Sequence, residues 1–247
     1  MAPVSLARSV AAWRSPEWVP TPRWRLACAS AALAVLVFCG YGAYVFAPDD
    51  GADAAAADQP AAATVLRELT SRADDPRPLT AHEVFPDPRV VVGLSGSAYP
   101  VLRVQVLADC AEAAAGGVGP LLAAAGCSQV VRATLRSPDA AYVATAGLVN
   151  LADAAGAQAV HERIKPLVDA GTGRFRGMPA GPGTDGLAHD TAQLGWHVRG
   201  HFVAYAVIAR TDGGRIWVDD PVARQILSDL IELHLRARVL DRRASIR

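Results

Sequence analysis

The stretch QLGWHVRGHFVAYAVIAR, residues 193–210, decides the fold class of this chain. Aromatic and β-branched residues are frequent in it, and along its second half both alternating sets are largely apolar, which is typical of a strand buried on two faces. Arg199-Gly200 predicts a two-residue turn, because glycine supplies the positive φ that such turns need. We therefore expect a β-hairpin in which Val198 lies opposite His201.

The residues before this hairpin predict further strands and helices. Strand patterns occupy 101–107, 128–136 and 141–151, and the last two are joined by the turn residues 137–139, which predicts a second hairpin. Three apolar patterns of helical spacing each follow a predicted N-cap: Asp109, Asp153 and Asp220. Pro221, directly after Asp220, is expected at the first helical position. Pro166 is expected to kink or shorten the middle helix.

Hairpins separated by helices indicate an α+β domain, an antiparallel sheet with helices packed on one face. The helix–strand–strand order occurs twice, which suggests duplicated ferredoxin-like halves. We expect this folded domain to span residues 89–240 and to be followed by a basic tail at 241–247.

The N-terminal part of the chain has the pattern of a membrane anchor. Residues 26–47, LACASAALAVLVFCGYGAYVFA, carry no charge, and a helix of this length reaches roughly 33 Å, enough to cross a bilayer. The basic tail 1–25 has four arginines against Glu17, which predicts a cytoplasmic N-terminus and an extracytoplasmic domain. The alternative is a cleaved signal peptide ending at Ala47, but the apolar run is longer than the usual h-region. Residues 48–88, acidic at first and then rich in alanine and proline, are expected to form a spacer and stalk.

The cysteines divide between these regions. Cys28 and Cys39 fall in the apolar segment and are expected to act as small apolar residues, whereas Cys110 and Cys127 fall in the exported part. An oxidising compartment favours a bridge between the latter pair, and closing a loop of this size is worth about 3 kcal/mol. No further ligands lie near this pair in the sequence, so we expect a disulfide and no metal.

The long glycine- and proline-rich loop at 171–191 is the candidate contact surface, because loops on a rigid sheet commonly carry binding. Its candidate residues, together with those of the neighbouring hairpin, are Arg174, Phe175, Arg176, Asp185, His189, His197, Arg199 and His201. The arginines could form a basic patch for an anionic wall polymer, a lipid headgroup or an envelope protein. The alternative is that they protect sheet edges from self-pairing.

The sequence patterns that would indicate a catalytic or metal site are incomplete. His197 and His201 stand four apart, but Gly200 and the strand pattern argue against the helix that such a zinc pair needs, and no third ligand is near. The stretch GLSGS at 93–97 lacks the second glycine of a nucleophile elbow. We therefore expect no catalytic residue, metal or cofactor, and the zero net charge gives no indication of nucleic acid.

Several stretches, GCSQVVRATL (126–135), TAGLVNLADAAGA (145–157), GTDGL (183–187) and residues 192–213, resemble a family of uncharacterised actinobacterial membrane-anchored proteins. A ratio of twenty-three arginines to the single Lys165 is typical of a high-GC bacterial genome. The resemblance implies the anchor, the paired cysteines and the location, and no activity. The favoured function is a non-catalytic extracytoplasmic domain that binds an envelope partner or ligand. The alternatives are a hydrolase that uses the 171–191 loop and a structural or oligomerisation role in the envelope.

Overall fold

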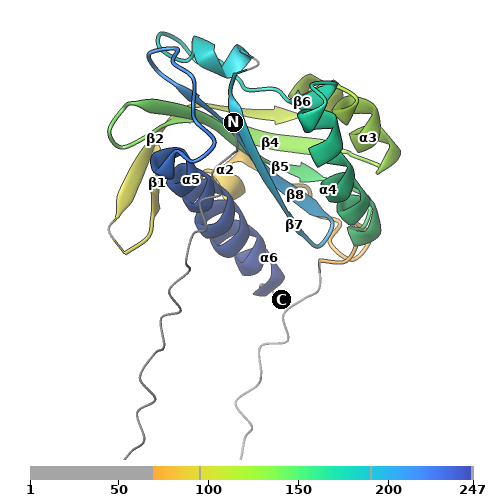
Figure 1. Ribbon diagram of the computed structural model, residues 1–247. Coiled ribbons are helices and arrows are strands. Elements are labelled where there is room, and N and C mark those ends of the chain that lie inside the picture. Colours follow the sequence, from red (N-terminus) through yellow and green to blue (C-terminus); the bar gives the residue numbers. More distant parts are fainter. Residues whose placement is uncertain (1–68, 95, 190, 246–247) are drawn as a thin grey trace, which may run out of the picture. The chain divides into compact units, whose positions relative to one another are not determined.

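The computed structural model describes residues 69–94, 96–189 and 191–245 (Figure 1). The expected anchor at 26–47, with Cys28 and Cys39, therefore lies outside the described residues. No helix within the described ranges is both long enough and apolar enough to cross a membrane.

An antiparallel six-stranded sheet forms the centre of the domain, in the order β1-β2-β4-β5-β8-β7. The α+β class is thus confirmed. The strands are β1 (Arg89–Val92), β2 (Ser97–Leu107), β4 (Gln129–Arg136), β5 (Tyr142–Asn150), β7 (Gln193–Arg199) and β8 (Phe202–Arg210), and a small second sheet pairs β3 (Ala114–Gly116) with β6 (Gly173–Phe175). Both expected hairpins, β4–β5 and β7–β8, are present.

Helices cover both faces of the sheet, so the expectation of helices on one face is wrong. On one face lies the C-terminal helix, made of α5 (Pro221–Leu227), the π-helical segment η3 (Ser228–Leu240) and α6 (Asp241–Ser245), together with the short α2 (Ala81–Val84). The other face carries α3 (Val118–Ala124), α4 (Ala154–Asp169) and the 3₁₀ turns η1 (Cys110–Ala113) and η2 (Asp185–Ala188). Figure 1 shows the C-terminal helix apart from α3 and α4.

The two central strands explain this arrangement. Every residue of β5 is buried, and so is nearly every residue of β8. In β8, Ala204, Ala206 and Ile208 pack toward the C-terminal helix, whereas the alternate residues Val203 and Tyr205 pack toward α3 and α4. Because successive side chains of a strand point to opposite faces, a strand that is apolar on both needs a cover on both.

Duplicated ferredoxin-like halves are not found. The connection β5-α4-β7 is a split unit, since β8 lies between its two strands. In the first half, β2 and β4 are joined through α3 and are direct antiparallel neighbours, so nothing lies between them. The two halves therefore share an order of elements along the chain and not a topology.

The turn of the 193–210 hairpin is one residue later than expected. Arg199 pairs with Phe202 and Val198 with Val203, so the turn residues are Gly200 and His201. Gly200 has φ +59°, and a Cβ at this position would lie 2.0 Å from the carbonyl oxygen of Leu69. The backbone of residue 69 thus occupies the space beside Gly200, and contact with this segment, which lies distant in the sequence, fixes the turn.

The folded domain also begins earlier and ends later than the expected range 89–240. Leu69 and Leu79 are buried, and Ser71 forms a β-bridge with Asp153. Arg243, expected in a basic tail, is 2% exposed and forms ion pairs with Asp75 at 2.5 Å and with Glu83. Residues 69–88 are therefore part of the domain rather than a stalk.

The expected helix starts are confirmed. Asp153 accepts a hydrogen bond from the amide of Gly156 at 2.7 Å, and Asp220 accepts from the amides at the start of α5. Asp109 caps a 3₁₀ turn rather than an α-helix. Pro166 does not end α4, which continues to Asp169, because a proline in the last turn leaves most of the helical hydrogen bonds in place.

Candidate functional site

The 171–191 loop is held against the body of the domain by the small β3–β6 sheet. Gly116 of β3 has φ +57°, and a Cβ there would lie 2.0 Å from the carbonyl oxygen of Thr172. The amide of Gly117 donates to that same oxygen at 2.9 Å. A side chain at 116 would therefore push the loop away, and its absence lets β6 lie flat against β3.

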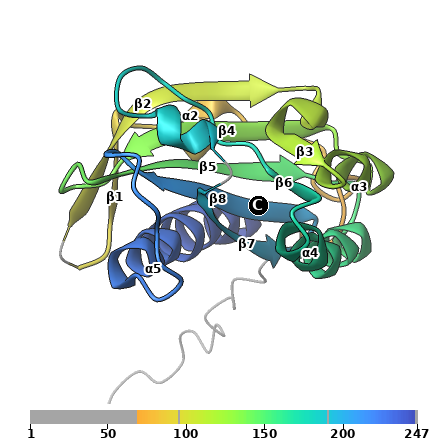
Figure 2. The same cartoon turned by 45° about the horizontal axis from the view of Figure 1, so that its top comes forward.

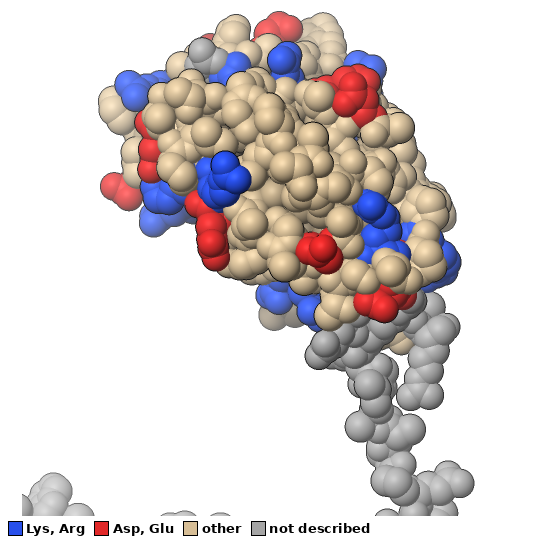
Figure 3. Space-filling view, turned by 90° about the vertical axis from the view of Figure 1, so that its right-hand side faces the viewer, with Lys and Arg blue, Asp and Glu red and all other residues tan. Residues whose placement is uncertain are grey.

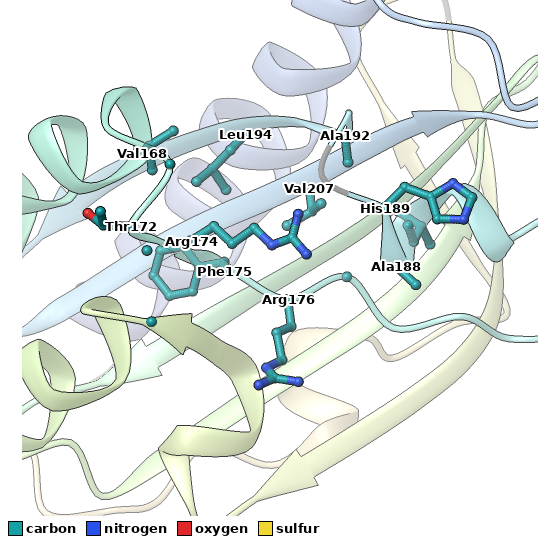
Figure 4. Close-up of a pocket in the computed structure, with 15 residues that line it drawn as sticks. Val168, Thr172, Arg174, Phe175, Arg176, Ala188, His189, Ala192, Leu194 and Val207 are labelled. Atoms are coloured by element: carbon teal, nitrogen blue, oxygen red, sulfur yellow. The ribbon is translucent and has the colours of Figure 1, made fainter.

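A cavity of about 350 Å³ lies where this loop meets the sheet. The end of α4, β6 and the residues after η2 form its sides, together with the first residues of β7. Val207 of β8 lies behind them (Figure 4). The lining side chains other than glycine are Val168, Thr172, Arg174, Phe175, Arg176, Leu187, Ala188, His189, Ala192, Leu194 and Val207. Its volume is in the range of small-molecule sites.

The apolar part of the cavity rests on an aromatic stack. Phe175 is 1% exposed, and its ring lies 4.2 Å from that of Tyr205, centroid to centroid, with an interplanar angle of 11°. Burial raises the pKa of Tyr205 to about 12, so this ring stays neutral. Leu194 and Val207 continue the apolar wall. The cavity can therefore hold an apolar group as well as a polar one.

Two arginines are fixed at this site by neutral oxygens. Arg176 donates from Nε to the carbonyl oxygen of Ala114 at 2.6 Å, and its own carbonyl accepts from Arg132 Nη1 at 3.4 Å. Arg132 is 6% exposed, and its Nε and Nη2 donate to Gln105 Oε1 at 3.0 and 2.8 Å. No ion pair to Arg132 or Arg176 is formed within the described residues. Among the described residues, the positive charges of Arg132 and Arg176 are thus stabilised by the dipoles of neutral groups, which leaves a favourable place for an anion.

Arg174 and His189 complete the polar part of the lining. Figure 4 shows the Arg174 side chain extending across the middle of the cavity in the direction of His189. His189 is exposed and follows η2, where its amide donates to the carbonyl oxygen of Gly186 at 3.1 Å. Among the described lining residues none is an aspartate or glutamate. The arrangement favours a ligand that carries a negative charge.

Arginines outside the cavity do not add to its basic lining. Figure 3 shows the side of the molecule that carries α3 and α4, whose centre is made of uncharged side chains, with charged ones toward its margins. Arg199, the third arginine expected in a basic patch, is paired with Asp241 at 2.9 Å. Arg210, at the end of β8, is paired with Asp212 at 2.6 Å. They do not extend the site.

The structure brings together only half of the expected binding residues. Arg174, Phe175, Arg176 and His189 line the cavity, whereas Asp185, His197, Arg199 and His201 do not. Asp185 is exposed at the start of η2.

The two hairpin histidines have other roles. His197 lies 3.2 Å from Glu232 on the C-terminal helix. His201, expected on the surface, is fully buried with its Nδ1 3.0 Å from the Leu69 carbonyl oxygen, and burial lowers its pKa. It cannot contribute to a binding surface because the shifted turn points it into the core. Within the described ranges no group of three or more His, Cys, Asp or Glu is placed to hold a metal ion.

Several lining residues were missed from the sequence. Val168, Leu194 and Val207 come from α4, β7 and β8, and each appears as an ordinary apolar position in its element. Arg132, which lies behind the lining residue Arg176, is a charged residue in the buried middle of β4, at 6% exposure. That one charge in the apolar run of 130–135 is the only signal that could have suggested a polar function on this face.

The expected disulfide is confirmed and supports the cavity. Cys110 at the start of η1 is bonded to Cys127, which follows α3, so the closed loop contains β3. Through its pairing with β6, β3 positions Arg174 and Phe175. The bridge thus restrains the scaffold of the site.

Comparisons with protein-family models, curated proteins and solved structures found no match to this chain.

Proposed function

We propose that this chain is a membrane-anchored, extracytoplasmic binding domain that does no catalysis and takes an anionic group of an envelope ligand in the cavity beside β6. The ligand chemistry is a phosphate or carboxylate next to an apolar moiety, as in a lipid headgroup or an anionic wall polymer. The location rests on the uncharged segment 26–47 and its flanking arginines, and the disulfide is in keeping with an oxidising compartment.

The observation that carries the proposal is the set of basic side chains at one cavity. Arg174 and Arg176 line it, and Arg132 is buried directly behind the backbone of Arg176 with only neutral acceptors. A bound anion would compensate the charges of Arg132 and Arg176 in a partly enclosed site, where charge–charge attraction is screened less than at an open surface.

Point variants test this better than removal of the loop. Deleting 173–190 would remove Phe175 and Leu187 from the core, together with the hydrogen bond from the amide of Met178 to Thr145 Oγ1. The full chain in detergent micelles is titrated with inorganic phosphate and, separately, reconstituted with vesicles of phosphatidylglycerol or phosphatidylcholine. We expect saturable phosphate binding or preference for phosphatidylglycerol, weakened at least tenfold by Arg174→Ala or Arg176→Ala and by high salt.

Arg163→Ala is the matched control, because Arg163 is an exposed arginine on α4 outside the cavity. Binding of equal strength in the Arg174 and Arg163 variants would contradict the site. The hydrolase alternative requires a histidine that meets a carboxylate and a hydroxyl, and no described residue of these types is hydrogen-bonded to the His189 ring. Turnover of an ester or phosphodiester reporter that is lost in His189→Ala would replace binding by catalysis.

A further inference from the structure

The outer edge of β2 is open over half of its length. β1 pairs only with Ser97–Pro100, and β4 lies on the inner side from Val101 to Leu107. Among the described residues no strand pairs with the outer side of 102–107. Figure 2 shows β2 along the upper edge of the sheet. A strand in this position presents unpaired amides and carbonyls to any extended partner.

Two exposed apolar side chains lie along this open edge of β2. Val104 is 37% and Val106 is 48% exposed, and they lie opposite Ala133 and Val131 on the sheet face that carries the C-terminal helix. The outermost strands of the sheet are β1 and β7. β1 is only four residues long and carries one exposed valine, Val91 at 43%, whose carbonyl oxygen accepts a hydrogen bond from Arg238. β7 has no large exposed apolar side chain, and its Trp196 and Arg199 side chains donate hydrogen bonds to His161 and Asp241. Among the described strands, the 102–107 part of β2 is therefore the one that combines a run of open backbone with two exposed valines on one face.

We propose that this edge pairs with the same edge of a second copy of the chain, antiparallel and about a two-fold axis at Gln105. The register shift between Val101 and Arg103 ends the regular part of the edge, so the usable segment is Arg103–Leu107. Pairing this segment with itself about its centre uses every residue of it. This inference does not depend on the proposed ligand site.

The sequence of the segment is self-complementary in that register. Val104 of each copy lies opposite Val106 of the other copy, so two apolar pairs flank the two-fold axis on one face of the sheet. On the other face Gln105 lies opposite Gln105 of the second copy. Arg103 lies opposite Leu107 of the second copy, and the two Arg103 residues are about 14 Å apart at 3.4 Å per residue. No like charges are opposed, and an isologous contact of this kind closes as a dimer rather than a fibre.

The contact is small, which decides how it is tested. Stable interfaces bury about 1,200–2,000 Å² in total, more than a five-residue edge provides by itself, so we expect a weak, concentration-dependent dimer. Crosslinking at one position captures such a contact. The full chain, with Cys28 and Cys39 replaced by serine, carries Gln105→Cys and is oxidised mildly in membranes of the expressing cells. A covalent dimer is expected on a non-reducing gel, at least tenfold more abundant than with Arg103→Cys. Equal yields at the two positions, or none at Gln105, would overturn the register.

A second measurement covers the case in which Gln105→Cys disturbs Arg132. Light scattering of the wild-type chain in detergent should show a monomer–dimer shift with concentration. Val104→Lys should weaken the dimer at least tenfold, and Leu233→Lys should leave it unchanged, because Leu233 is an equally exposed apolar residue of η3 at 40%. A chain that stays monomeric at every concentration, or a dimer unaffected by Val104→Lys, refutes self-pairing.

Discussion

Removing the disulfide tests how the scaffold of the cavity is stabilised. The double variant Cys110→Ala, Cys127→Ala opens a loop whose ends are 17 residues apart. The chain-entropy model gives about 10 cal/mol/K for a loop of this length, or about 3 kcal/mol at 25 °C. We expect the free energy of unfolding to fall by that amount, because the unfolded chain regains the conformations that the bridge excludes.

The assay is urea denaturation of the domain followed by circular dichroism. Wild-type protein in a dithiol reductant should show the same loss as the double variant, which separates the bridge from the loss of two side chains. Replacing Cys28 and Cys39, which lie in the apolar segment, should leave the transition unchanged.

Because β3 holds β6, phosphate binding in the cavity should weaken in the bridge variant even where most of the molecules remain folded. An unfolding free energy within about 0.5 kcal/mol of the wild type would show that the loop is restrained by packing alone, and the entropy argument would fail.

Three further predictions concern other parts of the fold. Arg243→Ala should cost about 3–5 kcal/mol of unfolding free energy in urea, because it breaks the buried ion pair with Asp75 and the ion pair with Glu83; a loss below 1 kcal/mol would contradict this. Gly200→Ala should destabilise more than Gly213→Ala, since both have positive φ but only the first meets backbone within 4 Å; equal thermal midpoints would show that the contact yields. Burial lowers the pKa of His234 to about 4, below its unfolded value of about 6.5. The unfolded chain therefore binds a proton first, and about 3 kcal/mol of stability present above pH 6.5 should be lost as the pH falls toward 4; stability curves that coincide for wild type and His234→Gln would refute it.

Much of the fold follows from local patterns that the sequence displays. The β4–β5 and β7–β8 hairpins, the capping roles of Asp153 and Asp220 and the Cys110–Cys127 bridge were each expected. These features depend on residues close together in the chain, on strand periodicity and turn chemistry, or, for the bridge, on the compartment. Local rules are sufficient for them.

The register at Gly200 and the place of His201 depended on a distant segment. A turn at Arg199-Gly200 and one at Gly200-His201 both place glycine at a position of positive φ, and local sequence does not separate them. The amide of His201 donates to the Leu69 carbonyl oxygen at 2.7 Å, and its ring contacts the same oxygen. That contact selects the later turn and buries a histidine that the earlier turn would have left at the surface.

The candidate site shows the same division. One glycine-rich loop supplies Arg174, Phe175, Arg176 and His189. The sequence identifies this loop because a segment rich in glycine and proline connects helices and strands in any fold. Its apolar wall comes from α4, β7 and β8, which only the packed sheet brings beside the loop. The sequence by itself determined that β8 is apolar on both faces, but which helix covers each face was decided by tertiary packing. The reason is physical: a two-sided apolar strand gains by burial against any apolar surface, and the choice among surfaces is made by the connections and fit of the whole chain.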